Sequence, residues 1–183
     1  MTRYVALFRG INVGKAKRIA MADLRALLAK LGFSDIQTLL NSGNAVFTGA
    51  PATADKLAAR LREAVAKKLG VDALVIVKSA EDVAGIMSGN RLEKLATDHS
   101  RLLVAMTSDR KAMARLKEIS AADWGAEKVH GGKHAAYVWC ANGILESKVL
   151  GTVLKKLDNA GTTRNWATLL KIHALLTTGG KAA

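Results

Sequence analysis

The residues best suited to chemistry stand in a basic, glycine-containing turn near the N-terminus, with the sequence RGINVGKAKR from residue 9 to residue 18. Glycine tolerates positive φ and lets a ligand approach the backbone closely. Cationic side chains attract negatively charged ligands. We therefore predict that this turn binds an anion. The residues concerned are Arg9, Gly10, Asn12, Gly14, Lys15, Lys17 and Arg18.

The turn lies between a predicted strand and a predicted helix, which must hold it in place. Residues 4–8 form a short apolar run that is typical of a buried strand. Downstream, Leu24, Leu27, Leu28 and Leu31 recur at helical spacing. The first N–H groups of a helix have no partner within it, so they would face an anion held in the turn.

The turn matches neither of two common phosphate-binding motifs. A P-loop has the pattern G-x-x-x-x-G-K followed by Ser or Thr, whereas this chain has G-I-N-V-G-K followed by Ala16. The G-x-G-x-x-G fingerprint of dinucleotide-binding proteins does not occur here either. A turn with solvated cations and no ligand is therefore the alternative interpretation.

The overall charge favours a polyanionic partner. The 183 residues include 28 Lys and Arg against 15 Asp and Glu, which gives a net charge of +13. Nucleic acid is the first candidate, and phosphorylated small molecules or an anionic membrane surface are the alternatives. One version would stack nucleic-acid bases on Tyr4, Phe8 and Phe47, although the sequence signature of RNA-recognition domains is missing.

Composition also limits the class of protein. Half of the residues, 50%, are hydrophobic, which predicts a folded globular chain. We expect no transmembrane segment, because no apolar run approaches the roughly 20 residues that a bilayer requires, and no signal peptide. The single cysteine, Cys140, excludes an intramolecular disulfide and suits a reducing compartment. We therefore predict a cytoplasmic protein.

The order of predicted elements indicates an α+β fold built from two ferredoxin-like units with antiparallel sheets. In residues 1–78 a strand, a helix, a two-stranded hairpin, a helix and a strand follow one another, which is the βαββαβ arrangement. Residues 79–183 repeat this order less regularly and end in a helix. We predict a domain boundary between these two ranges.

The last helix is predicted to begin near Thr163, with Thr163 as its N-cap. Arg164, Asn165 and Trp166 would then occupy its first turn, where a cation is unfavourable with respect to the helix dipole. An acidic side chain or a bound anion would compensate for Arg164. Trp166 belongs to the predicted inward face and suits either a buried core or a stacking platform. That face comprises Trp166, Leu169, Leu170, His173 and Leu176.

Three segments together resemble one protein family. They are RGINVG at residues 9–14, SGN at 42–44 and TTRNW at 162–166. Their order, in a chain of this length, resembles the bacterial family of uncharacterised proteins called domain of unknown function 1697. The resemblance implies two α+β units of ferredoxin-like topology and brings no established activity. The chain departs from the usual family pattern at Lys15, where a glycine is common, and at Ala167, where an asparagine is common.

We predict that these segments converge on one basic cleft between the two units. The neutral hydrogen-bonding groups would come from the asparagine and serine side chains of the three segments. An ordinary hairpin turn is the alternative interpretation of SGN. The predicted ligand-binding residues are Arg9, Gly10, Asn12, Gly14, Lys15, Lys17, Ser42, Asn44, Arg164, Asn165 and Trp166.

The function that these patterns favour is non-catalytic binding of an anionic, phosphate-bearing ligand, either nucleic acid or a nucleotide. We predict no cofactor and no metal, because the pair His130 and His134 has no carboxylate in its loop. No nucleophile motif accompanies Cys140, and we leave open whether the chain is an enzyme. The alternatives are a small-molecule enzyme with a pocket between the units, and a structural or adaptor protein.

Overall fold

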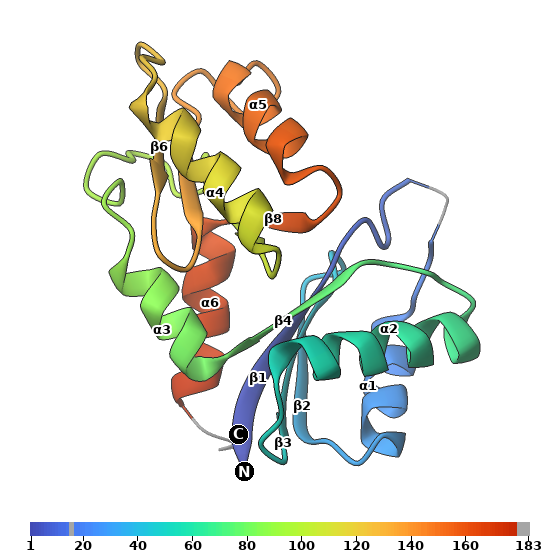
Figure 1. The fold of residues 1–183 in the computed structure, drawn as a ribbon. Coiled ribbons are helices and arrows are strands. Elements are labelled where there is room, and N and C mark those ends of the chain that lie inside the picture. Colours follow the sequence, from blue (N-terminus) through green and yellow to red (C-terminus); the bar gives the residue numbers. More distant parts are fainter. Residues whose placement is uncertain (15–16, 179–183) are drawn as a thin grey trace. The chain divides into compact units, whose positions relative to one another are not determined.

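A computed structural model describes residues 1–14 and 17–178 of the chain (Figure 1). They form two compact units, one made of residues 1–83 with the segment that starts at Ile172, and the other of residues 84–171. Each contains a four-stranded antiparallel sheet with helices between strands. The predicted α+β class with two ferredoxin-like units is thus confirmed. The predicted boundary between a domain of residues 1–78 and one of residues 79–183 stays a prediction.

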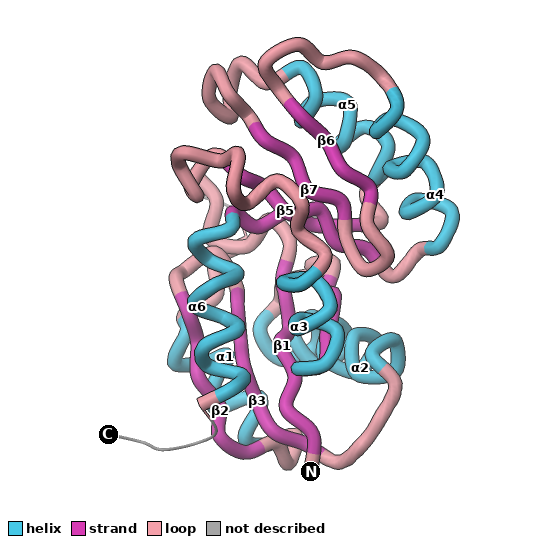
Figure 2. The backbone as a smooth tube through the Cα atoms, turned by 90° about the vertical axis from the view of Figure 1, so that its left-hand side faces the viewer, coloured by secondary structure: helices cyan, strands magenta, loops and turns pink. Residues whose placement is uncertain are grey.

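The first unit follows the βαββαβ order. Its elements are β1 (Thr2–Phe8), α1 (Met21–Lys30), β2 (Ser34–Leu39), β3 (Asn44–Gly49), α2 (Ala54–Leu69) and β4 (Val75–Ser79). The strands lie in the order β2-β3-β1-β4, so β1 sits between β3 and β4. Figure 2 shows β2, β3 and β1 side by side. Both helices pack on the same face of this sheet (Figure 1).

The core of the first unit lies between that face and the two helices. Tyr4, Ala6 and Phe8 alternate along β1, because successive residues of a strand point to opposite faces. They pack with the apolar stripes of α1 and α2, and Phe47 of β3 joins them. Tyr4, Phe8 and Phe47 are only 3%, 0% and 0% exposed. The suggestion that they stack on nucleic-acid bases is therefore wrong, because helices cover them.

The second unit repeats the arrangement. Its elements are α3 (Ala80–Ser88), β5 (Leu102–Thr107), α4 (Arg110–Glu118), a short 3-10 helix η1 (Ile119–Ala121), β6 (Lys128–Gly131), β7 (Ala136–Trp139), α5 (Lys148–Leu157), β8 (Gly161–Asn165) and α6 (Trp166–Thr177). Helix α3 begins in the first unit, and helix α6 ends in it. The strand order β6-β7-β5-β8 corresponds to that of the first sheet. α4 and α5 contribute to one core against this sheet.

The predicted start of the last helix is wrong. Residues Gly161–Asn165 form β8, which pairs with β5 and places Arg164 opposite Val104. The N-cap is Asn165, whose Oδ1 accepts a hydrogen bond from the N–H of Thr168 at 2.8 Å. Pairing with a distant strand thus overrides the local capping signal at Thr163.

The predicted inward face of the last helix also needs correction. Trp166, Leu169 and Leu176 are buried as predicted, but Ile172 is buried while Leu170 is 37% exposed. His173 is only partly buried. A 3.6-residue repeat accommodates Trp166, Leu169, Ile172 and Leu176 on one stripe, which is the face that the helix uses.

Candidate anion-binding site

The predicted turn between β1 and α1 has an unusual backbone. Gly10, Asn12, Gly14 and Lys17 have φ angles of 68°, 57°, 63° and 52°, all in the left-handed region. The N–H of Asn12 donates to the carbonyl of Lys17 at 3.0 Å and closes the loop. Lys15 lies outside the described residues, so its predicted role stays a prediction.

Asn12 holds this turn together with its side chain. Its Nδ2 donates to the carbonyl oxygens of Ile19 and Asn41, both at 2.9 Å, and its Oδ1 accepts from the N–H of Ile19 at 2.8 Å. Both polar atoms of the amide are therefore engaged within the protein. Asparagine also tolerates the left-handed region better than most residues. These contacts make Asn12 a residue that shapes the turn.

The SGN segment lies directly against the turn. The N–H of Phe8 donates to the carbonyl of Gly43 at 2.8 Å. A Cβ atom on Gly43 would lie 2.7 Å from Cδ1 of Ile11, so only glycine allows this approach. Asn44 is buried, and its Nδ2 donates to the carbonyl of Leu39 at 2.8 Å and to Oγ of Ser42 at 3.3 Å. The structure thus brings the first two family segments together within the first unit.

A small cavity opens at the junction of the turn and α1. Its volume is about 370 Å³, and its described lining residues include no carboxylate. Arg18 lines this cavity, and both Lys17 and Arg18 are exposed. No side chain of the described residues caps α1, whose N-cap position is Ala20. The lining residues are Asn12, Arg18, Ile19, Ala20, Met21 and Asn41.

The surroundings of the cavity are not purely cationic. The pKa of Asp72 lies below its usual value chiefly because of hydrogen bonds from Arg62, at 2.6 and 2.9 Å, and Lys17 adds a smaller contribution through its charge. Arg9 is half-buried, and its backbone N–H donates to the carbonyl of Leu74 at 2.9 Å. Because Asp72 is already paired with Arg62, it offsets Lys17 only in part.

The third family segment lies in the second unit. Nη1 of Arg164 donates to Oγ1 of Thr162 at 2.9 Å and to the carbonyl of Thr163 at 2.8 Å. Burial lowers the pKa of Arg164 to about 10, which leaves the guanidinium charged at neutral pH. Val104 pairs with Arg164 on one side and with Tyr137 on the other, so the three residues share one face of the sheet.

Asn165 and Trp166 have structural contacts within the second unit. Asn165 caps α6. Trp166 is 1% exposed, and its Nε1 donates to Oε1 of Glu93 at 3.0 Å. Such a buried tryptophan with a satisfied N–H is typical of a core residue. The predicted convergence of TTRNW with the turn, and the ligand-binding role of its residues, stay predictions.

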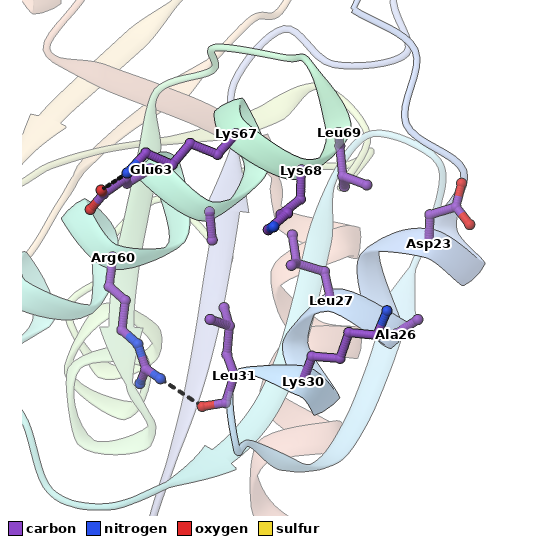
Figure 3. A pocket seen from close by; sticks show the side chains of 11 residues that line it. Asp23, Ala26, Leu27, Lys30, Leu31, Arg60, Glu63, Lys67, Lys68 and Leu69 are labelled. Carbon is purple, nitrogen blue, oxygen red and sulfur yellow. Dashed lines mark hydrogen bonds and ion pairs between the residues drawn. The ribbon is translucent and has the colours of Figure 1, made fainter.

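Sequence reasoning missed a groove between α1 and α2 of about 640 Å³. Leu27, Leu31 and Leu69 line it together with basic residues at its rim (Figure 3). Arg60 donates to the carbonyl of Leu31 at 2.7 Å, and Lys67 pairs with Glu63 at 2.6 Å (Figure 3). The first contact links α2 to the C-terminal end of α1, whereas the second lies within α2.

Potential metal ligands and the single cysteine are the remaining groups that could take part in chemistry. In residues 1–14 and 17–178 no group of three or more His, Cys, Asp and Glu side chains could hold a metal ion. Cys140 is buried, and burial raises the pKa of its thiol. Reactive cysteines usually have a lowered pKa. No helix in the same described ranges is long and apolar enough to span a bilayer.

Comparisons with known proteins agree with the fold. The profile of a family described as "Protein of unknown function (DUF1697)" matches residues 1–137. Among solved structures, the conserved bacterial protein SP0830 from Streptococcus pneumoniae is similar, with a TM-score of 0.78 and 25% sequence identity, over 96% of this chain and 99% of that chain. No curated protein matches the sequence.

Proposed function

Since the chain belongs to the DUF1697 family of proteins of unknown function, we propose a function from the geometry of its first unit. The chain is a non-catalytic binder of a phosphate-bearing ligand, a nucleotide or nucleic acid, held at the β1–α1 turn. One observation carries this proposal. The N-terminus of α1, which no described side chain caps, opens on the cavity of about 370 Å³ beside Arg18.

The helix terminus supplies hydrogen-bond donors. The N–H of Leu24 donates to the carbonyl of Ala20 at 3.1 Å, which is the first hydrogen bond of the helical pattern. The N–H groups of α1 before Leu24 have no partner within the helix. At α2 the corresponding position is Thr53, whose hydroxyl accepts from the N–H of Lys56 at 3.4 Å. An anion at α1 would take the place of such a cap and would interact favourably with the helix dipole.

The charges around the cavity set the class of ligand. Arg18 lines the cavity and is exposed, Lys17 is the exposed residue before it in the chain, and the chain carries +13 overall. Asp23 lies in the first turn of α1 but does not line the cavity, so it competes with a ligand only weakly. A cavity of about 370 Å³ is at the lower end for ligand sites and suits one phosphate group with part of its substituent.

The test compares two charge-neutralising variants on the same helix region. We expect Arg18→Gln to weaken binding of a labelled single-stranded DNA, measured by fluorescence polarisation at low salt, by roughly three- to tenfold. Lys30→Gln, at the far end of α1, should leave the affinity unchanged although it removes the same charge. A nucleoside triphosphate should compete with the labelled DNA.

Two results would overturn this proposal. One is equal weakening by both variants, which would indicate a general charge effect. The other is no retention of DNA, RNA or nucleotide even at low salt. Steep loss of affinity with added salt is expected if several phosphates are engaged. The alternatives of an enzyme and of a structural or adaptor protein stay predictions.

A further inference from the structure

The second unit contains a cationic cavity of its own, at the turn of the β6–β7 hairpin. Its volume is about 450 Å³. Arg91 comes from the loop after α3, Lys117 from α4, and His130 and Lys133 from the hairpin, so three parts of the chain contribute. No carboxylate occurs among the described residues that line it. They are Ser88, Gly89, Arg91, Lys117, His130, Gly131, Gly132 and Lys133.

The cations of this cavity form no ion pair with another described residue. The ion pairs between described residues are Arg62–Asp72, Lys67–Glu63 and Arg101–Asp98, so none of them involves Arg91, Lys117 or Lys133. Like charges gathered around one cavity repel one another, and water only partly screens the repulsion. An anion in the cavity would relieve this repulsion.

Close backbone packing builds the walls of the cavity. A Cβ atom on Gly131 would lie 2.7 Å from Cα of Lys117, and one on Gly89 would lie 2.8 Å from the hydroxyl of Tyr137. One on Gly132 would lie 3.0 Å from the carbonyl oxygen of Ala135. Glycine is therefore needed for α4, the loop after α3 and the hairpin to approach one another. The N–H of Gly131 also donates to Oγ of Ser120 at 2.7 Å.

His130 adds a group whose charge can respond to a ligand. Its ring stacks on Tyr137, with ring centres 6.0 Å apart and an interplanar angle of 15°. Burial and the charge of Arg91 lower the pKa of His130, so the ring is neutral at neutral pH. Tyr137 stays protonated, with a pKa of about 12. The other charged or titratable neighbours are Lys117 and Lys133 in the lining, and His134, which lies against Gly85 of α3.

We propose that this cavity binds the phosphate group of a small phosphate monoester, independently of the β1–α1 turn. A phosphate monoester carries a charge between −1.5 and −2 near neutral pH, which matches a cluster of cations better than a singly charged anion does. Arg91 can supply a two-pronged contact and the lysines point charges. A volume of about 450 Å³ leaves room for the group esterified to the phosphate.

The test uses the intact chain with inorganic phosphate and a nucleoside 5′-monophosphate as probes, and the nucleoside without phosphate as control. NMR signals of the His130 ring should shift with both phosphates, and the pKa of His130 should rise, because a bound dianion favours the protonated ring. By calorimetry, Lys117→Gln should weaken binding of the monophosphate roughly fivefold or more. Lys111→Gln, on the same helix but outside the lining, should leave it unchanged.

Several outcomes would overturn the proposal. They are unmoved His130 signals, equal weakening by Lys111→Gln and Lys117→Gln, and tighter binding of an oligonucleotide without terminal phosphates than of the monophosphate. Arg18→Gln separates this proposal from the proposed function, since it should leave the response of His130 intact. Failure of DNA binding with an intact His130 response would therefore overturn the proposed function alone.

Discussion

The side-chain Nδ2 of Asn12 lies 2.9 Å from the backbone carbonyl oxygen of Asn41, although 29 residues separate the two in the sequence. This hydrogen bond joins the β1–α1 turn to the β2–β3 turn. It makes the conformation of the candidate site depend on one amide group. Asn12, which the sequence predicts as a ligand contact, thus links two turns of the first unit by a hydrogen bond.

Replacing Asn12 tests that relationship. Asn12→Ala removes its hydrogen bonds to both backbone groups of Ile19 and to the carbonyl of Asn41. We expect the free energy of unfolding to fall by about 2–4 kcal/mol, measured by urea denaturation. Asn41→Ala is the control, because it keeps the backbone carbonyl that accepts the bond, and it should cost less than about 1 kcal/mol. Equal losses of unfolding free energy in both variants would contradict a stabilising role for the side-chain hydrogen bonds of Asn12.

Gly43 should be far more sensitive to substitution than Gly10. Both have positive φ, 86° and 68°, so alanine at either position costs about 1 kcal/mol of backbone strain. Only at Gly43 would the new Cβ meet Ile11 and Phe8, at 2.7 and 2.8 Å, whereas nothing lies within 4 Å at Gly10. We expect Gly43→Ala to lose a further 1–3 kcal/mol or so in denaturation experiments. Similar losses at both positions would count against the close packing.

The N-cap of α6 can be located by mutation. Asn165→Ala removes the hydrogen bond to the N–H of Thr168 and should lower the free energy of unfolding by about 1 kcal/mol. Asn165→Ser retains a capping oxygen and should restore most of it. Thr163→Ala should have the smaller effect, since Thr163 lies in β8. A larger loss at Thr163 would instead favour the helix start predicted from the sequence.

Tyr137 should make stability fall at high pH. Its hydroxyl donates to the carbonyl of Ile86 at 2.6 Å, and burial raises its pKa from 10.0 to about 12. Because the folded protein favours the protonated phenol, this contribution is fully present below pH 10 and is lost as the pH rises toward 12. Over that range it amounts to roughly 2 kcal/mol.

The measurement for Tyr137 is the free energy of unfolding at a series of pH values. Tyr137→Phe should show a shallower decline than the parent protein in the alkaline range, because lysine titration is common to both. An absorbance titration of the Tyr4→Phe variant should report ionisation of Tyr137 alone, since the chain has 2 tyrosines. Ionisation of Tyr137 near pH 10 would contradict its burial.

Cys140 should resist thiol reagents in the native protein. It is fully buried, and burial raises the pKa of its thiol while a hydrogen bond with Ser147 opposes this. We expect a disulfide reagent at mildly alkaline pH to react at the rate of local or global unfolding, and to react at once in denaturant. Rapid reaction with the native protein, comparable to that of a free thiol, would show an accessible cysteine.

The order of elements could be predicted from the sequence because its signals are local. Thr53 and Gly70 bound α2, and Ser147 caps α5 by accepting from the N–H of Leu150 at 3.0 Å, as their residue types indicate. Leucine and valine stripes supplied the helical faces. These preferences act over a few residues, so a short window of the sequence contains them.

The segment TTRNW shows where such signals fail. Threonine before a helical pattern predicts an N-cap, but β5 offers a complete set of backbone partners to residues 161–165. Pairing with β5, about sixty positions earlier, makes these residues a strand. A local window of the sequence does not include both pairing partners.

The sequence by itself determined the α+β class, the two repeated units, most helix and strand positions and an excess of positive charge, because composition and periodicity carry that information. Only the tertiary structure decided what each polar residue does. Asn12, Asn44 and Asn165 have the same side chain, yet their amides bond to different backbone groups. The hydrogen-bond partners and the burial of a side chain depend on which distant segments come into contact, and these contacts exist only in the folded chain.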